Sequence, residues 1–150
     1  MLNTLLLVVA LSADGGAYAQ PGLGFEVIRR DPEQDLLLRV ESITGPAPQD
    51  CGRLMQPGTW GRPAYDLDDL AEPVRCATVA VGARRPAVVV LKTMGFDSWT
   101  AMGLLTNSSG QLWFFTYDNL YGQGTLRTRL CSNATAQVTA DGFPYLECAQ

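Results

Sequence analysis

The fold is decided by residues 87–132, which read AVVVLKTMGFDSWTAMGLLTNSSGQLWFFTYDNLYGQGTLRTRLCS. Residues 87–93 are apolar at consecutive positions, which is typical of a strand that is covered on both faces. Residues 99–106 and 111–118 flank the turn signal NSSG and predict a β-hairpin. In its second arm, large apolar residues occupy both alternate faces. This stretch therefore predicts antiparallel sheet.

Further strands follow towards the C-terminus. After the Gly-rich break at 122–124, residues 125–132 predict a strand. Its alternation predicts two faces: Leu126, Thr128 and Leu130 inward, and Arg127 and Arg129 outward. Residues 136–139 and 145–148 predict two short terminal strands around the turn signal Asp141-Gly142.

The segment before this sheet predicts one helix. Apolar residues in 66–84 recur at spacings of three and four, and Asp66, Asp68 and Asp69 suit the N-terminus of a helix. The alternative is a strand over 74–81, because that stretch is rich in Val and Thr. A metal site at these aspartates is the weaker interpretation, since the spacing of an EF-hand is missing.

The N-terminal third predicts two strands and a long loop. Residues 25–29 and 36–43 are rich in aliphatic residues and flank the turn signal RDPE at 30–33. In the second strand, Leu36, Leu38 and Val40 would share one face. Residues 44–65 carry many Gly and Pro residues and predict an irregular loop.

The four cysteines predict two disulfides. Cys51, Cys76, Cys131 and Cys148 form an even set without a Cys-x-x-Cys pair, which in an exported chain indicates structural bridges. Three pairings are possible, and we favour Cys51–Cys76 with Cys131–Cys148 because each closes a short loop. The predicted fold class is α+β: a mostly antiparallel sheet with one packed helix, stapled by two disulfides.

The N-terminus predicts a signal peptide. Residues 5–11 are an unbroken apolar run, and Ala17-Tyr18-Ala19 fits a cleavage site before Gln20. The run is too short to span a bilayer, and the alternative is a short buried helix or strand. We expect a leader over 1–19 and one exported domain over 20–150, secreted or periplasmic, with no membrane span after cleavage.

A resemblance covers residues 87–148. A strand, a hairpin that ends in Phe-x-Tyr-Asp, a Gly-rich break, a strand that ends in Cys and a terminal Gly-x-x-Tyr-x-x-Cys follow one another; these motifs contain Tyr117, Asp118, Cys131, Gly142, Tyr145 and Cys148. This order resembles a class of small exported bacterial proteins and lipoproteins of unknown function. The present chain has no lipid-attachment cysteine at the end of its apolar run. The resemblance implies an exported module and no activity.

Composition excludes several kinds of chemistry. The chain has 150 residues, a single domain's worth, and no histidine, which removes the Ser-His-Asp triad, the Cys-His pair and every His-ligated zinc site. Lys and Arg number 11 against 15 Asp and Glu, a net charge of −4, which argues against nucleic acid as the partner. We expect no metal and no cofactor.

Aromatic residues are the candidates for binding. Trp60, Phe96, Trp99 and Tyr121 fall in or beside predicted loops, and Trp and Tyr are enriched where proteins contact partners. We expect Phe96, Trp99 and Tyr121 to form a contact patch at one end of the sheet. The predicted function is a non-enzymatic exported binding module, such as an inhibitor, with an unidentified protein or cell-envelope partner.

An enzymatic alternative uses carboxylates. Asp97 and Asp118 are each close to aromatic residues, and two carboxylates can hydrolyse a glycosidic bond. The alternative function is therefore a hydrolase of envelope glycans, although both aspartates also suit turns. Ser98 with Lys92 is a weaker candidate dyad, because the spacing does not match Ser-x-x-Lys.

Overall fold

The structure is a computed structural model, and it describes residues 31–54, 65–93, 98–120 and 122–150. The predicted leader and the predicted strand at 25–29 lie outside these residues. The helices and strands are, in chain order, α1 (Pro32–Thr44), β1 (Gln49–Leu54), α2 (Leu67–Gly82), β2 (Ala87–Thr93), β3 (Trp99–Thr106), β4 (Leu112–Leu120), β5 (Gln123–Cys131), β6 (Asn133–Val138) and β7 (Pro144–Ala149).

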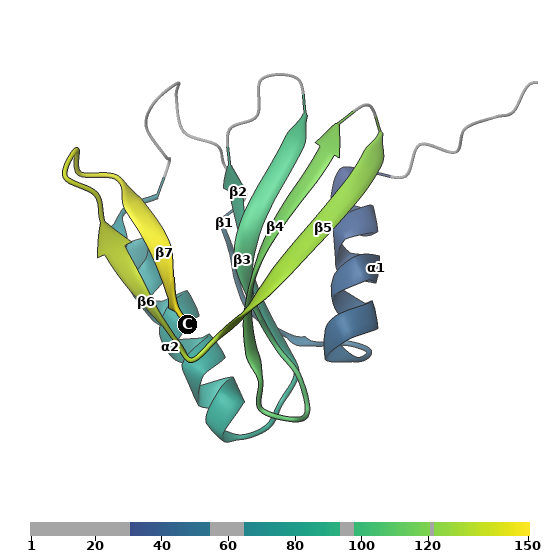
Figure 1. Cartoon of the computed structure of the whole chain (residues 1–150), viewed down its shortest axis with the longest axis horizontal. Helices are drawn as coiled ribbons and strands as arrows, with labels where there is room; N and C mark the ends of the chain where they lie inside the picture. Colours follow the sequence, from purple (N-terminus) through teal and green to yellow (C-terminus); the bar gives the residue numbers. More distant parts are fainter. Residues whose placement is uncertain (1–30, 55–64, 94–97, 121) are drawn as a thin grey trace, which may run out of the picture.

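Five strands form one sheet in the order β1-β2-β3-β4-β5. β1 and β2 are parallel and are joined through α2, whereas every other neighbouring pair is antiparallel. β6 and β7 form a separate antiparallel hairpin that packs on α2 (Figure 1). The predicted fold class, α+β with a mostly antiparallel sheet, is confirmed.

The sheet separates two apolar cores, because side chains alternate between its faces. Val89 and Leu91 of β2 face the core under α2, while Val88 and Val90 face the core under α1. β2 is thus buried on both faces, as predicted. The described part of the chain has two packed helices where the sequence predicted one (Figure 1).

The additional helix replaces a predicted strand. Residues 36–43 lie in α1, not in a strand, because Asp31 caps the helix and Pro32 opens its first turn. Leu36, Val40 and Thr44 are buried at a spacing of four, whereas Leu38 is 51% exposed. The predicted face with Leu38 was wrong, and helical periodicity accounts for the buried positions.

The predicted helix over 66–84 is confirmed as α2. The Asp66 side chain accepts a hydrogen bond from the Asp69 N–H at 3.0 Å, and the Asp69 carboxylate accepts one from the Asp66 N–H at 2.9 Å. This reciprocal capping box satisfies two helix-end donors. Asp66 and Asp69 therefore have a structural role, and Pro73 lies inside the helix on its buried side.

The predicted loop over 44–65 contains a strand, so that prediction was wrong in part. β1 pairs in parallel with β2, with an irregular register between Asp50 and Gly52. A side chain at Gly52 would approach Pro73 of α2 to 2.9 Å, so glycine lets β1 lie close to the helix. Tertiary contacts, and not the apolar alternation of a strand, position this segment.

The hairpin of β3 and β4 and the strand β5 are confirmed, but the predicted inward face of β5 is only partly correct. Leu126 packs against the core under α1. Thr128 is exposed and Leu130 is 56% exposed, because α1 contacts β5 but leaves this end of the strand uncovered. Arg127 and Arg129 are exposed, as predicted.

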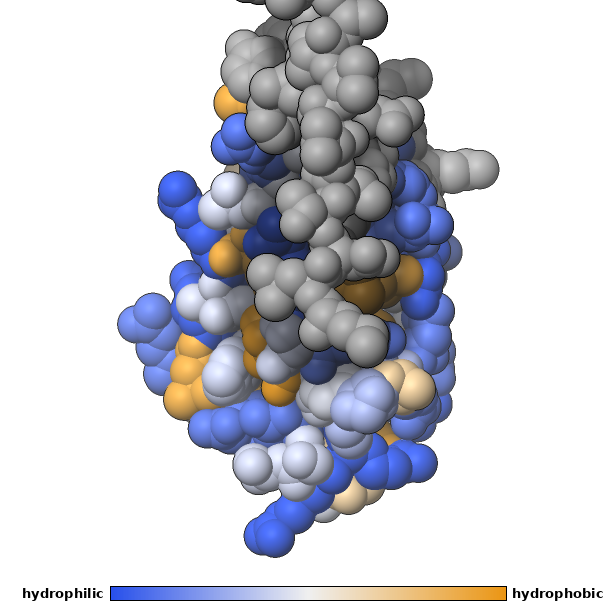
Figure 2. Space-filling model, turned by 90° about the vertical axis from the view of Figure 1, so that its right-hand side faces the viewer, coloured by the Kyte–Doolittle hydropathy of each residue, from blue (hydrophilic) through white to orange (hydrophobic). Residues whose placement is uncertain are grey.

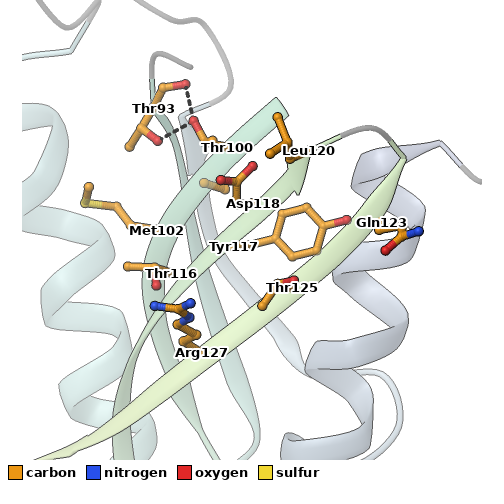
Figure 3. A pocket seen from close by; sticks show the side chains of 11 residues that line it. Thr93, Thr100, Met102, Thr116, Tyr117, Asp118, Leu120, Gln123, Thr125 and Arg127 are labelled. Atoms are coloured by element: carbon orange, nitrogen blue, oxygen red, sulfur yellow. Dashed lines mark hydrogen bonds between the residues drawn. The ribbon is translucent and has the colours of Figure 1, made fainter. Parts of the chain in front are cut away.

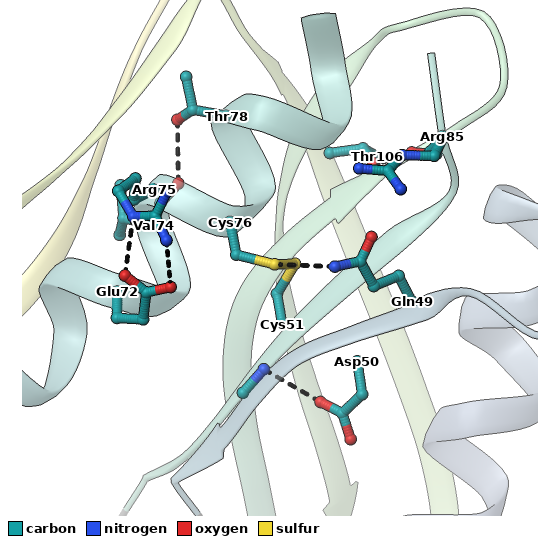
Figure 4. The surroundings of a disulfide bond; sticks show 11 residues. Gln49, Asp50, Cys51, Glu72, Val74, Arg75, Cys76, Thr78, Arg85 and Thr106 are labelled. Carbon is teal, nitrogen blue, oxygen red and sulfur yellow. Dashed lines mark hydrogen bonds and ion pairs between the residues drawn. A yellow bond between two sulfur atoms is a disulfide. The ribbon is translucent and has the colours of Figure 1, made fainter. Parts of the chain in front are cut away.

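The favoured disulfide pairing is confirmed. Cys51–Cys76 joins β1 to α2, and Cys131–Cys148 joins the end of β5 to β7. Figure 4 shows the first bridge with the Gln49 amide, which donates a hydrogen bond to the Cys76 sulfur at 3.4 Å. Each bridge ties a peripheral element to a neighbouring element of the fold.

Candidate functional site

An open groove of about 500 Å³ lies on the sheet face that carries α2, and the described residues that line it come from β2 to β5. Register partners place Thr93, Thr100, Asp118 and Thr125 in one row across β2 to β5. The next row towards the helix contains Met102, Thr116 and Arg127, as Figure 3 shows. Hydroxyl and charged side chains therefore dominate the groove.

Two opposite charges are available in this groove. Asp118 and Arg127 are exposed, and neither forms an ion pair or a side-chain hydrogen bond with the described residues. They occupy diagonal positions on neighbouring strands, a geometry that separates side chains by about 7–8 Å. A ligand with a cation and an anion at that spacing would meet both.

The threonines at the rim are ordered by hydrogen bonds. The Thr93 hydroxyl donates to the Thr100 hydroxyl at 2.8 Å, and the Thr100 hydroxyl donates to the Thr93 carbonyl at 3.1 Å (Figure 3). These bonds hold β2 and β3 together where β2 ends and β3 begins. Thr116 and Thr125 are exposed in the same groove, and their hydroxyls can donate or accept.

On the opposite face, a polar network anchors α1 to the sheet. The Tyr117 hydroxyl donates to the Asp35 carboxylate at 2.8 Å, and the Asn119 amide donates to the Tyr117 oxygen at 3.0 Å. Arg39 donates to the same Asp35 carboxylate at 2.7 Å. The pKa of Tyr117 is raised to about 12, mainly by burial; the hydrogen bond from Asn119 works against this rise, and the hydrogen bond to Asp35 adds to it.

We expect Tyr117→Phe to lower the free energy of unfolding by about 1–3 kcal/mol, because buried Asn119 loses its acceptor. The raised pKa means that the native state holds the phenol proton more tightly than the unfolded chain. The contribution of Tyr117 to the free energy of unfolding is therefore complete below pH 10, and it is lost as the pH rises from about 10 towards about 12. Urea unfolding across this range measures the difference between the parent and Tyr117→Phe. A difference that does not shrink with rising pH would contradict this.

Of the predicted contact aromatics, the structure describes only Trp99. Its side chain is half-buried, and its ring packs edge-on against Tyr117 at 5.7 Å between centroids. The Lys92 amine lies 5.9 Å from the centre of the Trp99 ring. Trp99 thus belongs to the α1 side of the sheet, not to the groove. Trp60, Phe96 and Tyr121 lie outside the described residues.

The structure describes only one of the two aspartates that were predicted to act as an acid pair. Asp118 lies in the groove, and Asp97 lies outside the described residues. No hydrogen bond joins Ser98 to Lys92 in the described part of the chain. Within that part, no group of three or more Cys, Asp or Glu residues gathers closely enough to hold a metal ion.

Sequence reasoning missed most of the groove. Thr93, Thr100 and Thr125 are ordinary strand residues in the sequence, and only the register of four strands brings them into a row. The sequence signal that could have located the groove was the position of Asp118, a charged residue in a strand whose alternate residues are large and apolar. A charge there must face solvent.

The compartment is indicated by the bridges. Two disulfides and no described free cysteine fit a protein of an oxidising, extracellular environment. Neither described helix has the length and apolar content needed to cross a membrane. Comparisons with protein-family models, with curated proteins and with solved structures find no match to this chain.

Proposed function

We propose that this protein is a non-enzymatic exported binding module, secreted or periplasmic, that recognises a partner protein through the sheet-face groove. The observation that carries the proposal is the presence of two exposed opposite charges, Asp118 and Arg127, that no described residue neutralises. Both charges stay hydrated in the free protein. A partner with complementary charges would gain specificity from both contacts.

The surroundings of the groove support a protein partner. Threonine hydroxyls at four positions can bond to backbone or polar side-chain groups of a partner. The sequence segments that hold Phe96 and Tyr121 start next to Thr93 and Leu120, and both of these residues line the groove. Phe96 and Tyr121 therefore remain our candidates for aromatic contacts at its rim.

The hydrolase of envelope glycans remains the second candidate because Asp118 lies in the groove. Glycoside hydrolysis ordinarily needs two carboxyl groups, about 5–10 Å apart. Asp118 is the single carboxylate among the described residues that line the groove. If the protein is a hydrolase, Asp118→Asn removes turnover of a glycan panel, whereas the binding proposal expects the parent to show no turnover.

Photo-crosslinking tests the groove. A photoreactive amino acid replaces Gln123, which is exposed and lines the groove, and the matched control carries it at exposed Arg75 on α2. We expect a stoichiometric protein adduct from position 123 and none from position 75. Adding Asp118→Lys should reduce that adduct about tenfold or more, because it places a cation where the partner's cation would bind.

The outcome that contradicts the proposal is equally specific. Equal adducts from positions 123 and 75, or an adduct from position 123 that Asp118→Lys leaves unchanged, would mean that the groove does not select a partner. Asp118 is exposed and makes no hydrogen bond with the described residues, so its substitution should leave the thermal midpoint unchanged. That midpoint serves as the folding control.

A further inference from the structure

Among the described strands, only β4 pairs with β5, so β5 is an edge strand of the five-stranded sheet. The other edge, β1, is shorter, has an irregular register and is bridged to α2. Four consecutive β5 residues, Arg127 to Leu130, are exposed. Alternate backbone N–H and C=O groups of an edge strand point away from the sheet and are free to pair with another strand.

The β5 edge is cationic although the chain as a whole is acidic. The strand reads QGTLRTRLC and contains two arginines and no carboxylate, in a protein of net charge −4. Arg127 and Arg129 point to the same face and form no ion pair with a described residue. Arg129 stacks over the Phe114 ring at 4.9 Å, a contact that orients the guanidinium and leaves its edge available for hydrogen bonds.

Pairing of β5 with a second copy of itself is disfavoured by these charges. An antiparallel pair that is centred on Arg127 places this residue opposite its own copy, and a pair centred on Thr128 places Arg127 opposite Arg129. Like charges directly opposite each other destabilise a sheet. Figure 2, which faces the right-hand side of Figure 1, shows a mainly hydrophilic surface with scattered hydrophobic spots where it is coloured. A large apolar dimer interface is not evident on that coloured surface.

We propose that the free edge of β5 accepts an extended acidic segment of a partner protein as an added strand. Carboxylates at alternate positions of that segment would face Arg127 and Arg129, and its intervening residues would lie beside Thr128 and Leu130. Main-chain hydrogen bonds supply affinity in this mode of binding, and the side chains select the sequence. The inference goes beyond the proposed groove function, because it concerns the sheet edge and a defined chemistry of the partner.

The test uses the full chain and two end-blocked peptides as long as β5. One peptide alternates glutamate with valine and threonine, and the other has lysine in place of glutamate. We expect the glutamate peptide to bind about tenfold or more tightly than the lysine peptide, with an affinity that falls as salt rises. Binding should also slow amide hydrogen exchange, measured by NMR, at the outward-facing β5 amides, which do not bond to β4. Binding of both peptides alike, binding without β5 protection, or no binding overturns the inference.

Charge reversal provides the matched comparison. In Arg127→Glu with Arg129→Glu, the preference between the peptides should invert. The control, Arg84→Glu with Arg85→Glu, makes the same change of net charge at exposed positions between α2 and β2 and should keep the parent's preference. If the reversed protein has a lowered thermal midpoint, Arg127→Gln with Arg129→Gln replaces it and should abolish the preference. A preference that survives both substitutions overturns the inference.

Two further results distinguish other occupants of the edge. Concentration-dependent dimerisation that protects the outward-facing β5 amides would assign the edge to a second copy. Outward-facing β5 amides, those that do not bond to β4, that are already protected in the monomer would assign the edge to another part of this chain. Either result overturns the inference. Arg129→Glu separates this surface from the groove, because Arg127 lines the groove and Arg129 does not. Loss of peptide selectivity with an unchanged photo-crosslink at position 123 would show that the two surfaces act independently.

Discussion

Reduction of both disulfides is expected to remove a large share of the free energy of unfolding. The bridges span sequence separations of 25 and 17 residues, which in the chain-entropy model stabilise the fold by roughly 3.5 and 3 kcal/mol. Their combined contribution of about 6–7 kcal/mol compares with a total stability of about 5–15 kcal/mol for an ordinary domain. Urea unfolding with and without a phosphine reductant measures the loss.

The two bridges should differ in where they act. Cys131–Cys148 ties the β6–β7 hairpin to the sheet, and Ala134 and Leu146 are the hairpin's buried contacts with the core under α2. In Cys131→Ala with Cys148→Ala, hydrogen exchange should accelerate first within β6 and β7. In Cys51→Ala with Cys76→Ala, it should accelerate first within β1 and α2. Superimposable unfolding curves before and after reduction would contradict the assigned role of both bridges.

The elements that the sequence predicted correctly are those that decide their own structure locally. α2 carries a capping box and a continuous helical spacing, and the β3–β4 hairpin carries strand alternation on both sides of a turn signal. α1 was mistaken for a strand because Leu36, Leu38 and Val40 follow the period of two that a strand has. Leu36 and Val40 are also four residues apart, which fits one face of a helix. The capping signal at Asp31 and Pro32 was the evidence that should have outweighed the alternation.

The candidate site was less predictable because it depends on register. Asp118 could be recognised as a charge in an apolar strand, but its neighbours Thr100 and Thr125 come from other strands. Likewise, the sequence of β5 does not reveal that the strand lies at an edge, which follows from the order of the whole sheet. Strand order arises from long-range pairing, and a local pattern contains no information about it.

Gly103→Ala is expected to lower the free energy of unfolding by about 3 kcal/mol or more. A loss of this size is a large fraction of the total stability of an ordinary domain. Gly103 is buried in β3 between Val90 of β2 and Phe115 of β4. A methyl group there would overlap the carbonyl oxygen of Val89 and would lie 2.6 Å from the Phe115 ring. The carbonyl belongs to the backbone of β2, so it cannot move without disturbing the β2–β3 pairing.

A second variant separates the two clashes. Adding Phe115→Leu removes the ring contact but not the overlap with the Val89 carbonyl, so it should restore only part of the lost stability. The matched control is Gly82→Ala at the end of α2, where a methyl group meets no atom within 4 Å; there we expect no loss or a gain of about 0.5–1 kcal/mol. Thermal and urea unfolding compare these three variants with the parent. A Gly103→Ala protein as stable as the parent would require a wider spacing of β2 and β3, and with it a different packing of Phe115 under α1.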